Sequence, residues 1–357
     1  GHTVVGEAQN GNEALEKCEK IDNIDLITMD ITMPGMDGIE TTTFMKEIKP
    51  KSNLFIVGAA KSGTTSIASY LDKHHKVFMC PIKEPHYFSK DIKPEEFTQE
   101  ICKKNILNIT EYLSNDILEK KHISFVRNLQ DYLDLYREVN NEVIIGDAST
   151  GYLFSEVAAN EIYKFNPQAK IIIILRDPVQ RAYSHWKMNI ASGIENSLPS
   201  FIDTMKNDFL SENKGFCKNH LYIDIGLYSE DVKRYLTQFP KDNIKILFFE
   251  DLANDTKKTM SDVYYFLELN DVNIDFNEKK NISTRIKYEW IKKINIMFNF
   301  SKFLPKCFYN YFKLKLSTTE FPPISSDDKR YLYLNFFKED IDNLEILLEK
   351  NLDQWKY

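Results

Sequence analysis

The sequence lacks any apolar run of roughly 18 residues, so no membrane-spanning helix is expected. Its first residues also lack the pattern of a secretory signal. Its five cysteines are scattered, odd in number and unaccompanied by histidines at zinc-ligand spacing. We therefore expect reduced thiols, no bound metal and a cytoplasmic protein.

An excess of positive charge is also missing, because 46 Lys and Arg face 53 Asp and Glu for a net charge of −7. This balance argues against a nucleic-acid-binding protein. The chain has 357 residues, of which 43% are hydrophobic, enough for two domains or for one large domain with an appendage. No feature of the sequence indicates an oligomeric state.

The chain is organised around Asn53–Tyr70, which reads NLFIVGAAKSGTTSIASY. An apolar strand is followed by a turn of small residues and then by an amphipathic helix. Free backbone N–H groups and the helix dipole make such a turn an anion site. The residues expected to line it are Lys61, Ser62, Gly63, Thr64, Thr65 and Ser66.

The spacing within this turn differs from that of nucleotide-hydrolysing loops, which read G-x-x-x-x-G-K-[ST]. Gly58 and Gly63 have the right separation, but Thr64 follows Gly63, and the lysine lies two positions before it, at Lys61. A nucleotide kinase or NTPase is therefore the weaker interpretation. A purely structural turn with a solvated lysine is another alternative.

A second motif, KIIIILRDPVQRAYSHW, spans Lys170–Trp186. Its buried strand ends at Arg176, and Asp177 and Pro178 suit a helix start. Arg176 and Ser184 can converge on one phosphate, with a planar fork of donors and a hydroxyl. The alternatives are a structural Arg176–Asp177 pair and an Arg181 that is solvated or only packs.

A third motif, KEPHYF at Lys83–Phe88, follows an expected strand. Glu84 is a candidate general base, because removing a proton from an alcohol needs a positioned base. The alternative is a surface Lys–Glu pair with a packing His86. A further element, DASTGYL at Asp147–Leu153, follows another expected strand.

Together these motifs resemble those of the sulfotransferases that use PAPS (3′-phosphoadenosine 5′-phosphosulfate), in particular bacterial and heparan-sulfate-type members. The resemblance covers nearly all of the chain after Ser52. It implies one sulfotransferase domain at 53–357 with a P-loop-like parallel sheet flanked by helices. It also implies PAPS as sulfuryl donor, PAP as product and no metal.

The resemblance assigns roles residue by residue. Lys61 and its loop would bind the 5′-phosphosulfate, and Arg176 and Ser184 the 3′-phosphate. Glu84 would act as base with His86 beside it. The loop that covers the cofactor is best matched by KNISTR, which ends at Arg285.

The acceptor is expected to be a carbohydrate hydroxyl, because KEPHYF matches the glycan-modifying enzymes. Ala148 stands where those enzymes have a lysine, which argues against a strongly anionic acceptor. An aromatic or lipid alcohol is the alternative acceptor, which the basic and aromatic stretch Ile291–Leu316 would bind. The other interpretation of this stretch is a pair of core or lid helices.

Residues 1–50 resemble the receiver family of response regulators, through VVGEAQNGNEALEKCEK and DLITMDITMPGMDGIE. Strands are expected at Thr3–Ala8 and Asp25–Met29, and a helix at Asn12–Glu19. Asp30 matches the phospho-acceptor. The central first strand and its acidic pair are missing from the match, so we expect an inactive remnant that packs on the next domain or on a partner. The alternative is a working signalling module.

After residue 50, branched apolar runs alternate with amphipathic stretches, which predicts a parallel sheet covered on both faces. The expected strands are Leu54–Val57, Val77–Met79, Val143–Ile145, Lys170–Leu175 and Ile244–Phe249. The expected helices are Ser66–Lys73, Glu156–Phe165, Val179–Ile190, Tyr228–Phe239 and Asp255–Leu267. Further helices are expected within Pro94–Asn140, around the acceptor.

Overall fold

Five parallel strands form the central sheet of the protein, in the order β2-β3-β1-β4-β5. The computed structural model describes residues 4–20, 27–30, 32, 51–99, 106–192, 200–270, 274, 276, 285–286, 317–318 and 321–357. The strands are β1 (Leu54–Gly58), β2 (Val77–Met79), β3 (Ile144–Ala148), β4 (Lys170–Leu175) and β5 (Ile244–Phe248). The predicted parallel sheet is therefore confirmed, with β2 and β4 at their predicted bounds.

β3 begins one residue later than predicted and continues three residues further, through Gly146, Asp147 and Ala148. Local pattern does not favour a strand there, because glycine and aspartate are poor strand formers. Pairing with β1 decides the outcome, since Leu54 is in register with Gly146 and Ile56 with Ala148.

Alternate residues of the strands enter two separate cores, as expected for a sheet covered on both faces. In β4, Ile171 and Ile173 pack into one core, whereas Ile172 and Ile174 pack into the other. The second core is closed by α3 (Thr64–Leu71), α12 (Phe249–Asn254) and α13 (Thr256–Phe266).

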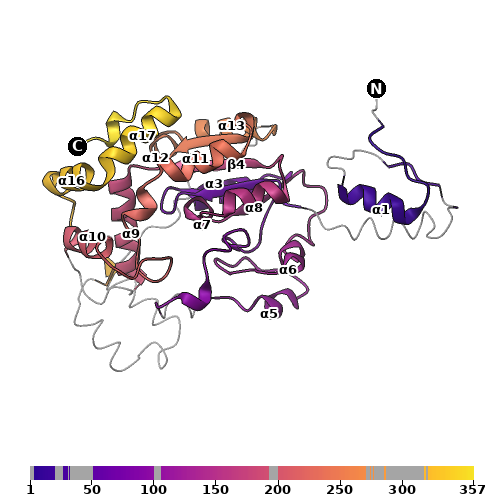
Figure 1. Cartoon of the computed structure of the whole chain (residues 1–357), viewed down its shortest axis with the longest axis horizontal. Coiled ribbons are helices and arrows are strands. Elements are labelled where there is room, and N and C mark those ends of the chain that lie inside the picture. Colours follow the sequence, from indigo (N-terminus) through magenta and orange to yellow (C-terminus); the bar gives the residue numbers. More distant parts are fainter. Residues whose placement is uncertain are drawn as a thin grey trace.

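The first core is the larger one, and its helices come from distant parts of the sequence. They include α7 (Gly151–Phe154), α8 (Ala158–Phe165), α9 (Pro178–Ser192), α11 (Ser229–Gln238), α16 (Ser326–Leu332) and α17 (Lys338–Leu348). A π-helical turn, η5 (Tyr333–Phe337), joins the last two. Figure 1 shows the C-terminal helices α16 and α17 in yellow at one end of the molecule.

The remaining described helices after residue 50 are short. Among the described residues of 94–140, the helices are η1 (Pro94–Glu96), α5 (Ile109–Leu113) and α6 (Leu129–Asp134). α10 (Phe201–Phe209), η2 (Asp224–Gly226), η3 (Lys241–Asn243) and η6 (Asp353–Trp355) complete the described helices after residue 50. The stretch Ile291–Leu316 lies outside the described residues.

In the first 50 residues the predicted helix is confirmed as α1 (Gly11–Lys20). The predicted strands are wrong for residues 4–8 and 27–29, which have no regular structure. Val4 and Val5 are 75% and 57% exposed. A strand is stable only when it is paired, and no strand in the described chain pairs with these residues.

β1 is the central strand, and the chain turns first to β2 and β3 on one side and then to β4 and β5 on the other. A parallel sheet binds ligands beyond the carboxyl ends of its strands, at the point where the strand order reverses. The Lys61, Glu84 and Arg176 motifs follow the ends of β1, β2 and β4.

Candidate active site

The loop after β1 ends in a left-handed residue, Gly63, with φ +100°, from which α3 starts. The carbonyl of Gly63 accepts from the N–H groups of Ser66 and Ile67 at 3.0 and 3.2 Å. The first-turn N–H groups of a helix have no partner within the helix, and this first turn holds no acidic side chain. The turn therefore has the backbone geometry that the predicted anion site requires.

Substituting Gly63 by alanine is expected to destabilise the loop by about 1–3 kcal/mol. A Cβ would have to accept the left-handed φ and would lie 3.0 Å from Cδ2 of Leu252. Urea unfolding of Gly63→Ala measures this loss directly. Unchanged unfolding would show that the loop does not depend on the left-handed turn.

Lys61 is largely buried next to this turn, and its Nζ lies 3.3 Å from Sδ of Met188. Burial first, and then the positive charge of Arg176, lower the pKa of Lys61 to about 8. A lysine that is buried among other cations is destabilised in its charged form, so the site favours a bound anion.

Arg176 connects the two predicted phosphate motifs. Its Nη1 donates to the carbonyl of Lys61 at 3.0 Å, and its guanidinium lies over the ring of Phe249 at 4.2 Å. The hydroxyl of Tyr228 donates to the carbonyl of Arg176 at 3.0 Å. Ser184 is part of the same motif and lies half-buried on α9.

Arg181 is fully buried, so the solvated alternative is wrong. Its Nη2 donates to the carbonyl of Tyr222, and burial lowers its pKa. None of the ion pairs among the described residues involves Lys61, Arg176 or Arg181. These three residues form a cation cluster, fully buried at Arg181 and partly buried at Lys61 and Arg176, that has no carboxylate ion pair among the described residues. Such a cluster meets the electrostatic requirement of a polyanion site.

Glu84 follows β2 and is 8% exposed. Its Oε1 accepts from Nζ of Lys83 at 2.6 Å, and its Oε2 lies 3.5 Å from Nε2 of His86. Burial opposes its ionisation, but the charges of Lys83 and His86 hold the pKa of Glu84 well below its usual range. The surface-pair alternative is therefore wrong: Glu84 is a buried carboxylate that stays ionised.

His86 is also fully buried. Its Nδ1 lies 3.2 Å from Oγ of Ser89, and its ring stacks on Phe125 with centroids 4.8 Å apart. Both Glu84 and His86 have left-handed backbones, with φ of +69° and +53°. Such backbones are costly for residues other than glycine, so the surrounding structure must hold them in place.

His122 was not predicted from the sequence, and the structure brings it close to Glu84. The backbone of 121–126 runs beside the Glu84 motif, where Lys83 N–H donates to the Lys121 carbonyl and Ser124 N–H to the Glu84 carbonyl, at 2.9 and 3.0 Å. Burial and the surrounding charges lower the pKa of His122, while nearby Glu84 raises it. No local motif marks this residue, since only the chain pairing places it there.

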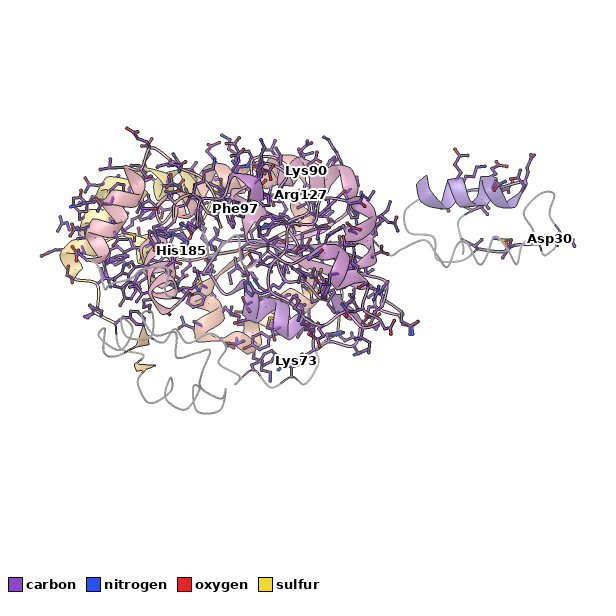
Figure 2. All side chains as sticks on the ribbon, turned by 90° about the horizontal axis from the view of Figure 1, so that it is seen from below. Asp30, Lys73, Lys90, Phe97, Arg127 and His185 are labelled. Atoms are coloured by element: carbon purple, nitrogen blue, oxygen red, sulfur yellow. The ribbon has the colours of Figure 1, made fainter. Side chains whose placement is uncertain are left out.

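Two predicted site residues remain, Arg285 and Asp30. The backbone of Arg285 is part of β6 (Arg285–Ile286), which pairs with β7 (Ser317–Thr318), and its side chain is outside the described residues. Asp30 is exposed and accepts from the Thr32 N–H at 3.2 Å. Figure 2 shows Asp30 far from Arg127 and His185.

The expectation that all the cysteines are reduced is wrong for Cys217, which is disulfide-bonded, whereas Cys80 is a free, buried thiol. Disulfides persist mainly in oxidising compartments, so the cysteines no longer support the prediction of a cytoplasmic protein. Among the described helices, none has both the length and the apolar composition needed to cross a bilayer.

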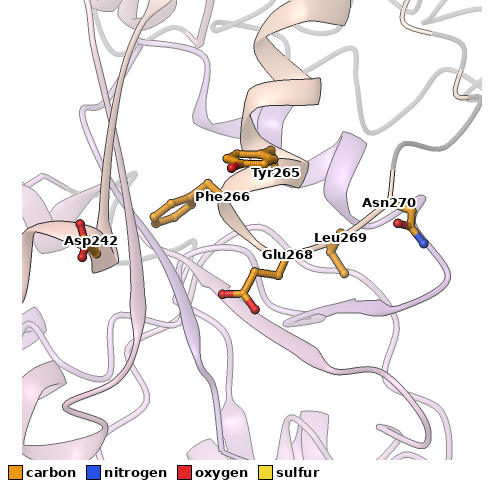
Figure 3. A pocket seen from close by; sticks show the side chains of 6 residues that line it. All are labelled: Asp242, Tyr265, Phe266, Glu268, Leu269 and Asn270. Atoms are coloured by element: carbon orange, nitrogen blue, oxygen red, sulfur yellow. The ribbon is translucent and has the colours of Figure 1, made fainter.

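Two cavities differ in their relation to the site. One of about 490 Å³ is lined by Asp242, which precedes β5, and by the end of α13 around Tyr265, so it lies at the opposite end of β5 (Figure 3). The other, of about 200 Å³, borders Thr65 of the Gly63 turn and Lys83 beside Glu84. Of these two cavities, the second is the one that borders residues of the predicted motifs.

Known proteins resemble this chain in sequence and structure. The family model described as "Sulfotransferase domain" matches residues 51–320. Carbohydrate sulfotransferase 15 of Mus musculus is 26% identical over 250 residues, which cover 61% of this chain and 44% of the relative. The chain thus spans less than half of that relative.

Two further comparisons concern the fold and a shorter stretch of sequence. A sulfotransferase crystal structure from Alicyclobacillus acidocaldarius superposes with a TM-score of 0.63 and 27% identity, over 86% of this chain and 99% of that one. Chemotaxis protein CheY of Thermotoga maritima is 42% identical over 59 residues, 16% of this chain and 48% of CheY. The latter agrees with the recognised receiver resemblance.

Proposed function

Since this chain belongs to the sulfotransferase domain family, we propose that it transfers the sulfuryl group of PAPS to an acceptor hydroxyl. The observation that carries this proposal is the cluster of Lys61, Arg176 and Arg181, in which Arg181 is fully buried and no member forms an ion pair with a carboxylate of the described residues. PAPS carries a phosphosulfate and a 3′-phosphate, and these anionic groups neutralise the three cations.

The two anionic ends of the donor are assigned to two motifs. Lys61 and the N–H groups of Gly63–Thr65 bind the phosphosulfate, and Arg176 with Ser184 binds the 3′-phosphate. The hydrogen bond from Arg176 to the Lys61 carbonyl supports a fixed distance between these two positions. Lysine and backbone dipoles supply the positive charge, so we propose that the reaction needs no metal.

The transfer is an in-line displacement at sulfur. A bond forms from the acceptor oxygen to sulfur while the bond from sulfur to the phosphate oxygen breaks, and PAP leaves with the electron pair. Glu84 takes the proton of the acceptor hydroxyl, with His86 beside it at 3.5 Å. Lys61 stabilises the charge that grows on the leaving phosphate oxygen, where preorganised donors contribute most.

In the free protein Glu84 is a weak base, because Lys83 contacts it at 2.6 Å. Lys83 also lies close enough to Lys61 to affect its charge. An anion bound at Lys61 therefore attracts the Lys83 ammonium away from Glu84. The carboxylate then loses its cation as the donor binds, and its basicity rises when it is needed.

A carbohydrate hydroxyl is the acceptor that we propose, in line with the name of the carbohydrate sulfotransferase to which the chain is similar. The cavity is bordered by Thr65 of the Gly63 turn and by Lys83, the neighbour of Glu84, and we propose that the acceptor enters there. Ala148 also lines it and leaves room at the position where the resembling enzymes have a lysine. An aromatic or lipid alcohol is the alternative.

Transfer of ³⁵S from labelled PAPS tests this function. The purified full chain is incubated in EDTA with neutral oligosaccharides, uronic-acid oligosaccharides, p-nitrophenol and a long-chain alcohol. We expect label in a saccharide. Label only in p-nitrophenol or the long-chain alcohol would replace the acceptor, and Mg²⁺-dependent phosphate transfer from ATP without sulfate transfer would favour a kinase.

The low pKa of Lys61 leads to a pH prediction for the same assay. Lys61 is charged below its pKa of about 8 and loses its proton as the pH rises through that value. We expect kcat/KM for PAPS to fall above pH 8, by at most about tenfold per pH unit for one proton. Lys61→Arg should move this fall to higher pH, because arginine stays charged. An identical alkaline fall in both proteins would assign it to another group.

A further inference from the structure

The base loop, Lys83–Phe88, is held by hydrogen bonds from outside itself. Its left-handed residues, Glu84 and His86, cannot rely on regular secondary structure. The Glu84 N–H donates to the carbonyl of Ala148 at 2.9 Å, and Nη1 of Arg127 donates to the carbonyl of His86 at 2.9 Å. Figure 2 labels Arg127.

Two further supports of the loop are side-chain hydroxyls of the segment that follows β3. The N–H of His86 donates to Oγ of Ser149 at 3.4 Å, and the N–H of Phe88 donates to the hydroxyl of Tyr152 at 3.5 Å. Both bonds are long, so the positions of the two hydroxyls decide whether the bonds persist.

One carboxylate fixes both hydroxyls. Asp147 is fully buried, and its Oδ1 accepts from Ser149 while its Oδ2 accepts from Tyr152, each at 2.9 Å. Oδ2 also accepts from Tyr132 at 2.9 Å. A hydroxyl that donates to a carboxylate turns its oxygen lone pairs toward other donors, which here are the backbone N–H groups of the base loop.

We propose that Asp147 is a positioning residue, whose carboxylate orients Ser149 and Tyr152 so that they hold the base loop and present Glu84 and His86. This role rests on the proposed function only in that Glu84 acts as the base. Burial raises the pKa of Asp147 to about 6, and the hydrogen bonds from Tyr152, Ser149 and Tyr132 oppose that rise. Asp147 does not touch the reacting atoms and acts through its two neighbours.

Tyr132 provides a matched control within the same network. Its hydroxyl donates to the same carboxylate at the same distance as Ser149, but its other hydroxyl partners, Ser52 and Tyr136, lie outside the base loop. Tyr132→Phe keeps the ring that stacks on Tyr87 with centroids 4.5 Å apart. Loss of one donor to Asp147 can thus be separated from loss of support for the loop.

Amide hydrogen exchange of the full chain, read on the peptide that contains 83–92, tests the proposal without donor or acceptor. Ser149→Ala and Tyr152→Phe should exchange roughly 3- to 10-fold faster there than the wild type, as expected for losing one hydrogen bond. Tyr132→Phe should match the wild type. PAP affinity and melting temperature serve as checks of folding.

Equal exchange in all four proteins, or equal acceleration in Tyr132→Phe and Ser149→Ala, would overturn the positioning role. In the transfer assay, Ser149→Ala should lower kcat about tenfold with little change in KM for PAPS, a loss of orientation rather than of donor binding. Because the exchange result needs no acceptor, absence of transfer in the wild type would refute the proposed reaction and leave the positioning test intact.

Discussion

Replacing Lys61 by alanine is expected to lower the turnover number for sulfate transfer about 100- to 1,000-fold, the usual loss when one preorganised donor to a developing anion is removed. The loop backbone supplies other donors, so PAP should bind with only modestly reduced affinity. The transfer assay measures the first quantity, and calorimetric titration with PAP the second.

Lys73→Ala is the matched control for this substitution. Lys73 is an exposed lysine two residues beyond the end of α3, and Figure 2 labels it. The control should keep wild-type turnover, since its charge lies outside the donor loop. Wild-type turnover in Lys61→Ala would contradict the proposal that Lys61 stabilises the leaving phosphate oxygen.

Replacing Glu84 by glutamine is expected to lower turnover about 100- to 10,000-fold, the range that general base catalysis contributes. Glutamine keeps the size of the side chain but cannot accept the acceptor's proton. PAP binding should persist, because Glu84 contacts Lys83 and His86 and not the cation cluster. Its removal frees Lys83, so PAP affinity should rise if it changes at all.

Glu95→Gln, at an exposed glutamate of η1, controls for the loss of a negative charge near this side of the molecule. Its turnover should equal that of the wild type. If Glu84→Gln retains full turnover while His122→Ala loses it, the base is His122, and the assignment of Glu84 is wrong.

The central strands could be predicted from sequence because their apolar runs are long and uninterrupted. β4 carries four consecutive isoleucines and forms at the predicted bounds. The end of β3 could not be predicted, since Gly146 and Asp147 enter the sheet only through pairing with β1. The strands expected in the first 50 residues illustrate the same rule, because their local pattern has no partner strand in the described chain.

The candidate site, like the fold, could be predicted only in part. The positions of Lys61 and Arg176 after adjacent strands followed from motif and topology, and the structure places them in direct contact. The roles of Arg127 and His122 did not follow, because both come from a segment without periodic pattern that lies beside the base loop only in the folded chain. The burial of Arg181 could not be predicted either, since an arginine on a helix is usually solvated.

Calorimetric titration with PAP in EDTA, with ATP titrated alongside, tests most directly the claim that the cation cluster is a PAPS site. Micromolar PAP binding without metal, lost in Arg176→Ala, is the result that the structure predicts. ATP binding that needs Mg²⁺, with no PAP binding, would contradict it and would make the loop at Lys61 a nucleotide kinase site.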